Sequence, residues 1–187
     1  MNRRFLWLTL ICALVISTTD DLYAADTKTQ FVGSFLHVES SNGEHCEGYG
    51  VTLWRKDESL VGILNHHRSL CGDPPTGFIE DVQYVPDTGD LSFKVKLWAE
   101  GCMGFDFKAG MCTNTTKDIV TFRGKLKSDV LEGTITWYSI NLKKKTLSEK
   151  VYLKREADGH EYKTYAGYER FVEYWLKVVE PQWNSSK

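Results

Sequence analysis

The sequence has few of the features that mark non-globular chains. It contains four prolines and fifteen glycines in 187 residues and shows no internal repeat, which argues against collagen-like and low-complexity proteins. An excess of positive charge is also missing, since 23 basic residues face 25 acidic ones, so nothing predicts attraction to nucleic acid or to an anionic membrane. A chain of this length is expected to fold as one globular domain without a partner.

A hydrophobic run long enough to span a membrane is absent as well. The apolar run Phe5 to Ile16 has twelve residues, whereas a bilayer span needs about 20. Arg3 and Arg4 precede this run and a polar stretch ending in Ala25 follows it, which is the order of a cleaved secretory signal. We therefore predict a signal peptide over residues 1–25, a mature domain over 26–187, and a secreted or periplasmic protein.

Motifs that specify a chemistry are missing. The chain has no nucleophile elbow, no paired-carboxylate spacing and no phosphate-binding loop. No two cysteines have the close spacing of a structural zinc site. We predict no catalytic residue, no cofactor and no metal, and acid–base chemistry by Glu39 with a nearby histidine is the enzymatic alternative that stays open.

Four cysteines remain after the predicted signal: Cys46, Cys71, Cys102 and Cys112. An even number in an oxidising compartment predicts two disulfides. Cys102 and Cys112 lie in one glycine-containing stretch, which favours a local pair and leaves Cys46 with Cys71. Because all four lie in long connections at one end of the predicted fold, the other two pairings remain open.

Alternation of apolar and polar residues dominates the mature chain. It is strict over Leu91–Leu97 and Val120–Leu126, which is typical of half-buried antiparallel strands. Six less regular segments bring the predicted total to eight strands: Phe31–Ser40, Tyr49–Arg55, Leu60–His67, Phe78–Val85, Leu131–Ile140 and Glu149–Arg155.

The connections between these strands alternate in length. Three are short and polar, at residues 56–59, 86–89 and 127–129, as expected for hairpin turns. The other four are longer, and in an up-and-down meander they all fall at the opposite end. The sequence thus predicts one tight end and one end rich in loops, which we call the mouth.

The period changes near the C-terminus. Apolar residues recur every three or four positions from Tyr165 to Val179, which is typical of an amphipathic helix. Asp158 and Glu161 resemble a capping box, and we expect Pro181 to end a helix of about residues 158–180. We expect its stripe, including Val172, Trp175 and Leu176, to cover Leu36 and Val38 on the outside of the first strand.

Two short features resemble the calycin barrels, the group of lipocalins and avidin-like proteins. Gly33-Ser34-Phe35 stands where those families carry Gly-x-Trp, and Arg155 stands where many lipocalins place an arginine over that aromatic ring. The resemblance implies an all-β fold, an eight-stranded antiparallel up-and-down barrel with a C-terminal α-helix packed outside. Fold alone does not assign a function.

Strand alternation also selects candidate ligand-binding residues near the mouth. If Phe35 faces inward, so do His37 and Glu39, while Val32, Leu36 and Val38 face outward. Trp137 shares the inward face of its strand, and His67 ends a strand at the same rim. We predict that His37, Glu39, His67 and Trp137 line a ligand pocket, although ordinary core or rim positions would explain each of them.

Two functions follow from this arrangement. The first is binding of a small, partly apolar molecule at the mouth. The alternative is a protein-interaction or inhibitor module that binds a partner protein through its long loops. In both cases we expect a monomer without nucleic-acid partners or a membrane span.

Overall fold

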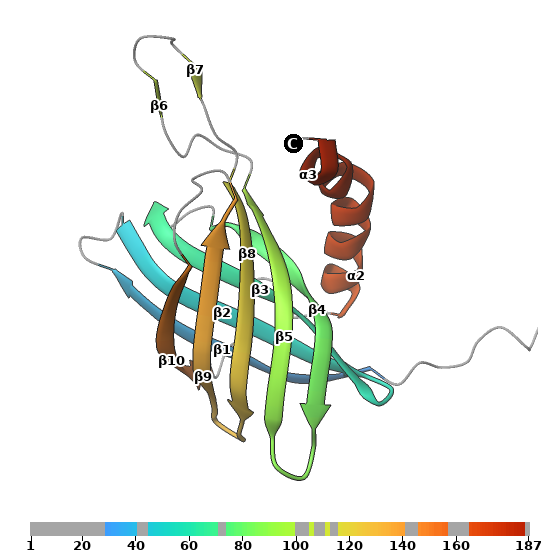
Figure 1. The fold of residues 1–187 in the computed structure, drawn as a ribbon. Coiled ribbons are helices and arrows are strands. Elements are labelled where there is room, and N and C mark those ends of the chain that lie inside the picture. Colours follow the sequence, from blue (N-terminus) through green and yellow to red (C-terminus); the bar gives the residue numbers. More distant parts are fainter. Residues whose placement is uncertain are drawn as a thin grey trace, which may run out of the picture.

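The computed structural model describes residues 29–40, 45–70, 74–99, 105–106, 111–112, 116–140, 146–156 and 165–185. Eight antiparallel strands form a closed barrel in the order β1-β10-β9-β8-β5-β4-β3-β2, with a helix at its side (Figure 1). The strands are β1 Thr29–Ser40, β2 His45–Lys56, β3 Ser59–Leu70, β4 Thr76–Val85, β5 Asp90–Ala99, β8 Thr116–Leu126, β9 Val130–Ser139 and β10 Leu147–Arg155. The predicted fold class is confirmed.

Several strands extend further toward the mouth than we predicted. β2 begins at His45 rather than Tyr49, and β8 begins at Thr116 rather than Val120. Polar residues occupy both faces there, so the alternation that marks a strand is lost although the ladder continues. A small hairpin, β6 (Phe105–Asp106) and β7 (Met111–Cys112), lies within the predicted loop between β5 and β8.

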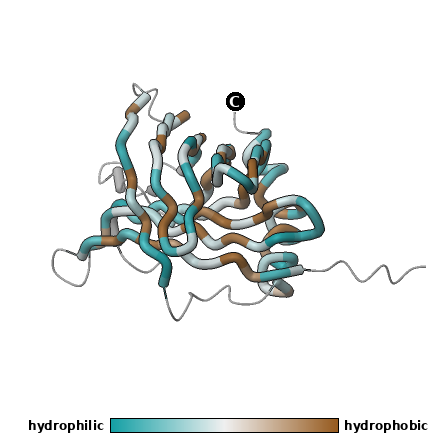
Figure 2. Tube along the Cα trace, turned by 90° about the horizontal axis from the view of Figure 1, so that it is seen from below, coloured by the Kyte–Doolittle hydropathy of each residue, from teal (hydrophilic) through white to brown (hydrophobic). Residues whose placement is uncertain are grey.

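The barrel interior near the short turns is filled by apolar side chains. Phe93 and Phe122 stack there with ring centroids 5.0 Å apart, and both are buried. Gly124 and Gly133 lie opposite each other, and a Cβ atom on either would approach the Phe122 ring to within 2.9 Å. These glycines therefore allow close packing and open no cavity. Figure 2 shows the resulting alternation of hydrophobic and hydrophilic residues along the strands.

β1 and β10 close the barrel through a short contact. Only Phe35 with Arg155 and Leu36 with Lys154 are paired. The Arg155 guanidinium lies over the Phe35 ring, 5.2 Å from its centroid, so the contact that the calycin resemblance implied is present. A Cβ atom on Gly33 would lie 2.8 Å from this guanidinium, which explains the need for glycine there.

A bulge corrects one predicted orientation in β1. The register with β2 shifts between Phe31 and Gly33, which makes Val32 the extra residue. Val32 consequently packs against the barrel core, whereas uninterrupted alternation predicted that it faces outward.

The C-terminal helix comprises α2 (Tyr165–Tyr174), a π-helical turn η1 (Trp175–Val179) and α3 (Glu180–Ser185). It does not cover β1, as we expected, but the outward side chains of β2 to β5. Tyr168 packs against Trp54 and Ile63, and Trp175 packs near Trp98 and Phe78. These large outward residues offer far more apolar area than Leu36 and Val38, and Leu176 stays 49% exposed.

Hydrogen bonds from Lys117 hold the end of this helix in place. The Lys117 ammonium group, on β8, donates hydrogen bonds to the backbone carbonyls of Gln182 and Trp183, at 3.1 and 2.9 Å. The helix continues past Pro181, where we expected it to end. The wider π turn immediately before Pro181 relieves the clash between a proline ring and the preceding turn, so the helix accommodates it.

Other predictions fall on parts of the chain that the structure leaves undescribed. The signal peptide and the helix start at Asp158 lie outside the described residues. Cys46, on β2, is disulfide-bonded, but Cys71 and Cys102 lie outside these residues, so the pairing of the four cysteines stays a prediction. No helix within the described ranges is long and apolar enough to cross a membrane.

Candidate ligand-binding site

A pocket of about 460 Å³ opens where β1 and β10 separate. The two strands pair only at Phe35 and Leu36, and from there toward the mouth their edges diverge. We call this opening the seam pocket. Its lining consists of His37, Glu39, Glu47, Gly48, Tyr49 and the β10 residues Glu149, Lys150, Val151, Tyr152, Leu153 and Lys154.

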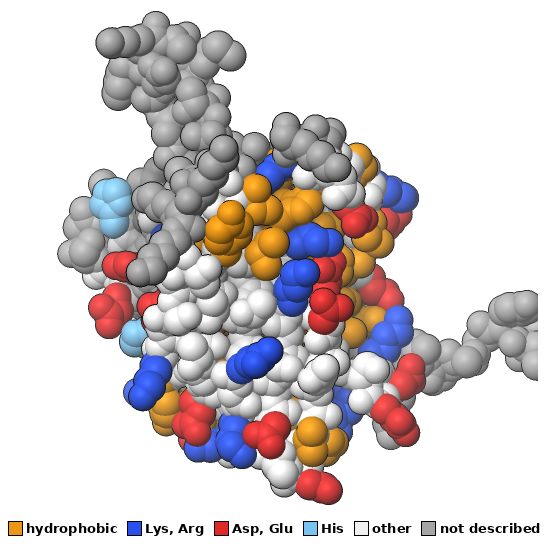
Figure 3. All heavy atoms as spheres, viewed as in Figure 1, with side chains coloured by type: hydrophobic (Ala, Val, Ile, Leu, Met, Phe, Trp, Pro, Cys, Tyr) orange, Lys and Arg blue, Asp and Glu red, His pale blue; other side chains and the backbone are white. Residues whose placement is uncertain are grey.

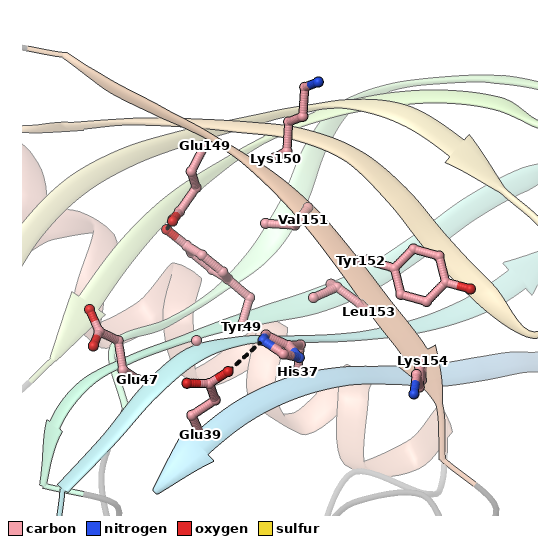
Figure 4. A pocket seen from close by; sticks show the side chains of 11 residues that line it. His37, Glu39, Glu47, Tyr49, Glu149, Lys150, Val151, Tyr152, Leu153 and Lys154 are labelled. Carbon is pink, nitrogen blue, oxygen red and sulfur yellow. Dashed lines mark hydrogen bonds and ion pairs between the residues drawn. The ribbon is translucent and has the colours of Figure 1, made fainter. Parts of the chain in front are cut away.

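Alternation along β10 sorts the lining into two faces. Glu149, Val151 and Leu153 point into the barrel, whereas Lys150 and Tyr152 point away from it (Figure 4). On the opposite side, the exposed side chains of His37 and Glu39 are neighbours, with 3.4 Å between Nε2 and Oε1. The pocket thus combines an apolar wall with a rim of three carboxylates, two lysines and a histidine.

Tyr49 connects the two sides of the seam pocket. Its hydroxyl donates a hydrogen bond to Oε1 of Glu149, across the gap between β2 and β10. Burial, and secondly this bond to a carboxylate, raise the pKa of Tyr49 above its usual value of 10.0. Tyr49 therefore remains a neutral donor, and it holds Glu149 toward the pocket.

His66 lies directly behind Tyr49 inside the barrel. The two rings stack with centroids 4.5 Å apart, and the Trp137 ring lies 6.0 Å from His66. Burial lowers the pKa of His66 to about 3, and the positive charge of Arg68 contributes to the shift. His66 is therefore neutral, and its buried Nδ1 has no hydrogen-bond partner among the described residues.

An ion pair lies deeper in the same layer. Nη1 of Arg68 is 2.9 Å from Oδ2 of Asp118, and the guanidinium also lies over the Trp137 ring at 5.5 Å. Asp118 is completely buried, and this burial raises its pKa, while a hydrogen bond from Ser139 and the charge of Arg68 oppose the rise.

The structure brings two of the four predicted ligand residues together. His37 and Glu39 both line the seam pocket. Trp137 lies inside the barrel as predicted, beside His66 rather than in the lining. His67 is not brought to them: it is buried on the opposite face of β3, the face that carries Val61 and Ile63 under the helix.

Sequence reasoning missed Tyr49, His66, Arg68, Asp118 and Glu149. The sequence contained a signal for some of these residues. Tyr49 lies two and four positions from the core residues Val51 and Leu53, so strand alternation directs it inward with them. Glu149 shares parity with Leu153 in the same way. Asp118 lay outside the predicted strand, and its position follows only once the alternation of Val120 and Phe122 is extended backward.

The seam pocket places polar, charged and apolar side chains together in one opening. The described residues contain no group of three or more metal-ligating side chains. The seam pocket instead offers hydrogen-bond acceptors, negative charge and apolar surface within one opening. Such a combination orients a ligand by a few polar contacts and holds it by apolar burial.

Comparisons with models of known protein families, with curated proteins and with solved structures gave no match. The closed eight-stranded antiparallel barrel is nevertheless consistent with a calycin-like architecture.

Proposed function

We propose that this protein binds a small, partly apolar molecule in the seam pocket without transforming it. The observation that carries the proposal is the pocket itself, whose volume of about 460 Å³ lies in the usual range for small-molecule sites. Val151 and Leu153 supply apolar surface, and His37, Glu39 and Glu149 supply polar contacts beside it. The filled interior near the short turns directs a ligand to the seam.

The cellular setting belongs to the same proposal. The predicted signal peptide and the even number of mature-chain cysteines support a secreted or periplasmic protein. The calycin-like barrel and the contact of Arg155 with Phe35 support kinship with lipocalins, many of which carry that contact. We propose a monomer, held by two disulfides, as the binding form.

A protein partner is the alternative function. The observation that favours it is the β6–β7 hairpin, which stands away from the barrel beyond the mouth (Figure 1). A partner bound through this hairpin and the neighbouring connections would leave the seam pocket unused. Figure 3 shows few hydrophobic side chains over the middle of β5, β8 and β9, and a hydrophobic patch near their upper ends, beside the helix.

Native mass spectrometry of the purified protein tests the small-molecule proposal. The wild type should retain a small molecule that is released on denaturation. His37→Trp should lose this molecule, because the larger ring fills the pocket from a side chain that is 59% exposed and does not contribute to the core. Thr134→Trp is the matched control, since Thr134 is exposed on the outer face of β9.

Retention of the same molecule by His37→Trp would contradict the proposed site. A protein that carries no molecule, and that binds none from a library of amphiphiles, would contradict the proposed function and favour the protein-partner alternative.

A further inference from the structure

The seam exposes strand edges as well as side chains. The backbone N–H of Arg155 bonds to Asp129 on the β9 side, and the N–H of Glu156 bonds to Ser34 on the β1 side. Because backbone groups alternate between the two sides of an antiparallel strand, the even-numbered residues of β10 face β1. Lys154 is paired with Leu36, but no described residue pairs with Tyr152 or Lys150 on that side.

The corresponding edge of β1 is also open. The N–H and C=O groups of Leu36 face β10, so those of Val38 do too, and no described residue of β10 pairs with Val38. The pocket therefore lies between two stretches of backbone whose donors and acceptors pair with no described strand. An isolated small molecule leaves most of them to water, whereas an extended peptide matches their spacing.

The charged side chains of the pocket lining limit which peptide sequences can bind. The lining carries three carboxylates, Glu39, Glu47 and Glu149, whereas its two lysines, Lys150 and Lys154, lie on the outward face of β10. Inward charges on an open edge discourage pairing with apolar strands of any sequence, because such pairing would bury them without a partner. They favour a strand that places a lysine or arginine opposite them.

The length of the bound peptide follows from the length of the unpaired stretch of β10. Residues Glu149 to Leu153 span four steps of about 3.4 Å, or roughly 14 Å. A peptide of about five residues covers this stretch, with alternate side chains directed into the pocket toward Glu149, Val151 and Leu153.

We infer that the ligand of the seam pocket is a short extended peptide that pairs with the open edge of β10 and directs a basic side chain to the carboxylates. This inference rests on the proposed function, since it names the class of small, partly apolar ligand. Main-chain hydrogen bonds to Lys150 and Tyr152 supply affinity, and the carboxylates and apolar wall select the side chains.

Calorimetric titration of the full chain with a defined peptide tests the inference. The probe is acetyl-Val-Thr-Lys-Thr-Val-amide, whose valines and lysine face inward and whose threonine backbone faces β10. N-methylation of both threonines removes the donors to β10 and leaves every side chain unchanged. We expect the N-methylated probe to bind at least tenfold more weakly, since two hydrogen bonds are lost.

Two substitutions at one position separate backbone from side-chain recognition. Tyr152→Pro removes an N–H that faces the seam and that the ladder with β9 does not use. It should weaken peptide binding at least tenfold. Tyr152→Ala keeps the N–H and should bind the peptide at least tenfold more tightly than Tyr152→Pro does.

A third variant tests the charge. Glu149→Gln should weaken binding of the lysine probe and leave a probe with norleucine in place of lysine unaffected. Equal loss for both probes would contradict the assigned role of the carboxylate.

The outcomes separate this inference from the proposed function. Equal binding of the N-methylated probe, or equal binding by Tyr152→Pro and Tyr152→Ala, overturns edge pairing. Absence of peptide binding together with a retained non-peptide molecule overturns the inference and leaves the proposed function standing. Dimerisation of the chain with protection of the Tyr152 amide against hydrogen exchange overturns the peptide in favour of a second copy.

Discussion

The two ends of the barrel interior differ although the same strands build both. Near the short turns, inward positions carry Phe35, Phe93 and Phe122, and an arginine outside the core closes the wall. Near the mouth, the inward positions of those strands and their neighbours carry Tyr49, His66, Arg68, Asp118 and Glu149. The wall is closed at the first end and open at the second.

This difference separates stability from binding. Apolar burial near the turns provides a continuous core, which is the main source of folding free energy. The mouth layer buries charged and polar groups whose desolvation offsets much of what their interactions contribute. A layer that contributes little to stability, and that keeps donors and acceptors beside an opening, is suited to hold a ligand.

The largest effect is expected at the turn end. Phe122→Ala should lower the free energy of unfolding by about 3–5 kcal/mol, because it removes a fully buried ring stacked on Phe93. Urea denaturation measures the change. Arg123→Ala, on the exposed face of the same strand, should change it by less than about 0.5 kcal/mol. A small effect of Phe122→Ala would mean that the two ends contribute alike.

A smaller loss is expected from breaking the ion pair of the mouth layer. Arg68→Met should cost about 1–3 kcal/mol, because Asp118 is left buried without its cation. The double substitution Arg68→Met with Asp118→Leu should recover most of this loss, since no buried charge then remains. If the double variant is as unstable as the single one, the pair contributes more than its desolvation costs.

Acid should destabilise the protein through His66. Its pKa is about 3 in the folded chain and near 6.5 in the unfolded chain. Between these values only the unfolded state takes up the proton, so stability falls as the pH decreases, by up to about 1.4 kcal/mol per pH unit. His66→Phe should reduce the slope of unfolding free energy against pH between 6.5 and 3. An unchanged slope would contradict the burial of a neutral imidazole.

The smallest effect is expected at the closure itself. Arg155→Lys should cost about 0.5–1 kcal/mol, since an ammonium group stacks on Phe35 less well than the planar guanidinium and loses the hydrogen bond from Nε to the Ser128 carbonyl. Hydrogen exchange of the Leu36 and Lys154 amides should become faster. Unchanged exchange would show that backbone pairing alone holds the wall.

Much of the fold was predictable because alternation and turn residues are local signals. The eight strands and the short turns follow from positions along the chain, whereas the contact of Arg155 with Phe35 was implied by the calycin resemblance. The face covered by the helix did not follow, because an apolar stripe does not identify its partner surface. The outward aromatics Trp54 and Trp98 carried that information.

The candidate site was predicted less well. A period of two fixes relative orientation but not which of two neighbours points inward, so His67 was chosen where His66 faces Tyr49. His37 and Glu39 both line the seam pocket, since Phe35 anchors their parity, and their role in ligand binding stays a prediction. The position of the seam depends on where pairing between the first and last strands stops. No residue near Leu36 indicates that position in the sequence.

The short contact between β1 and β10 also sets an order of assembly. These are the first and last strands of the barrel, so their pairing joins the residues most distant along the chain and requires the greatest loss of chain entropy. We therefore expect the contact to form after the remaining sheet is in place, and to open before the rest of the sheet during native fluctuations. We expect the strands beneath the helix to stay paired during such opening, so the barrel can open at the β1–β10 contact without global unfolding.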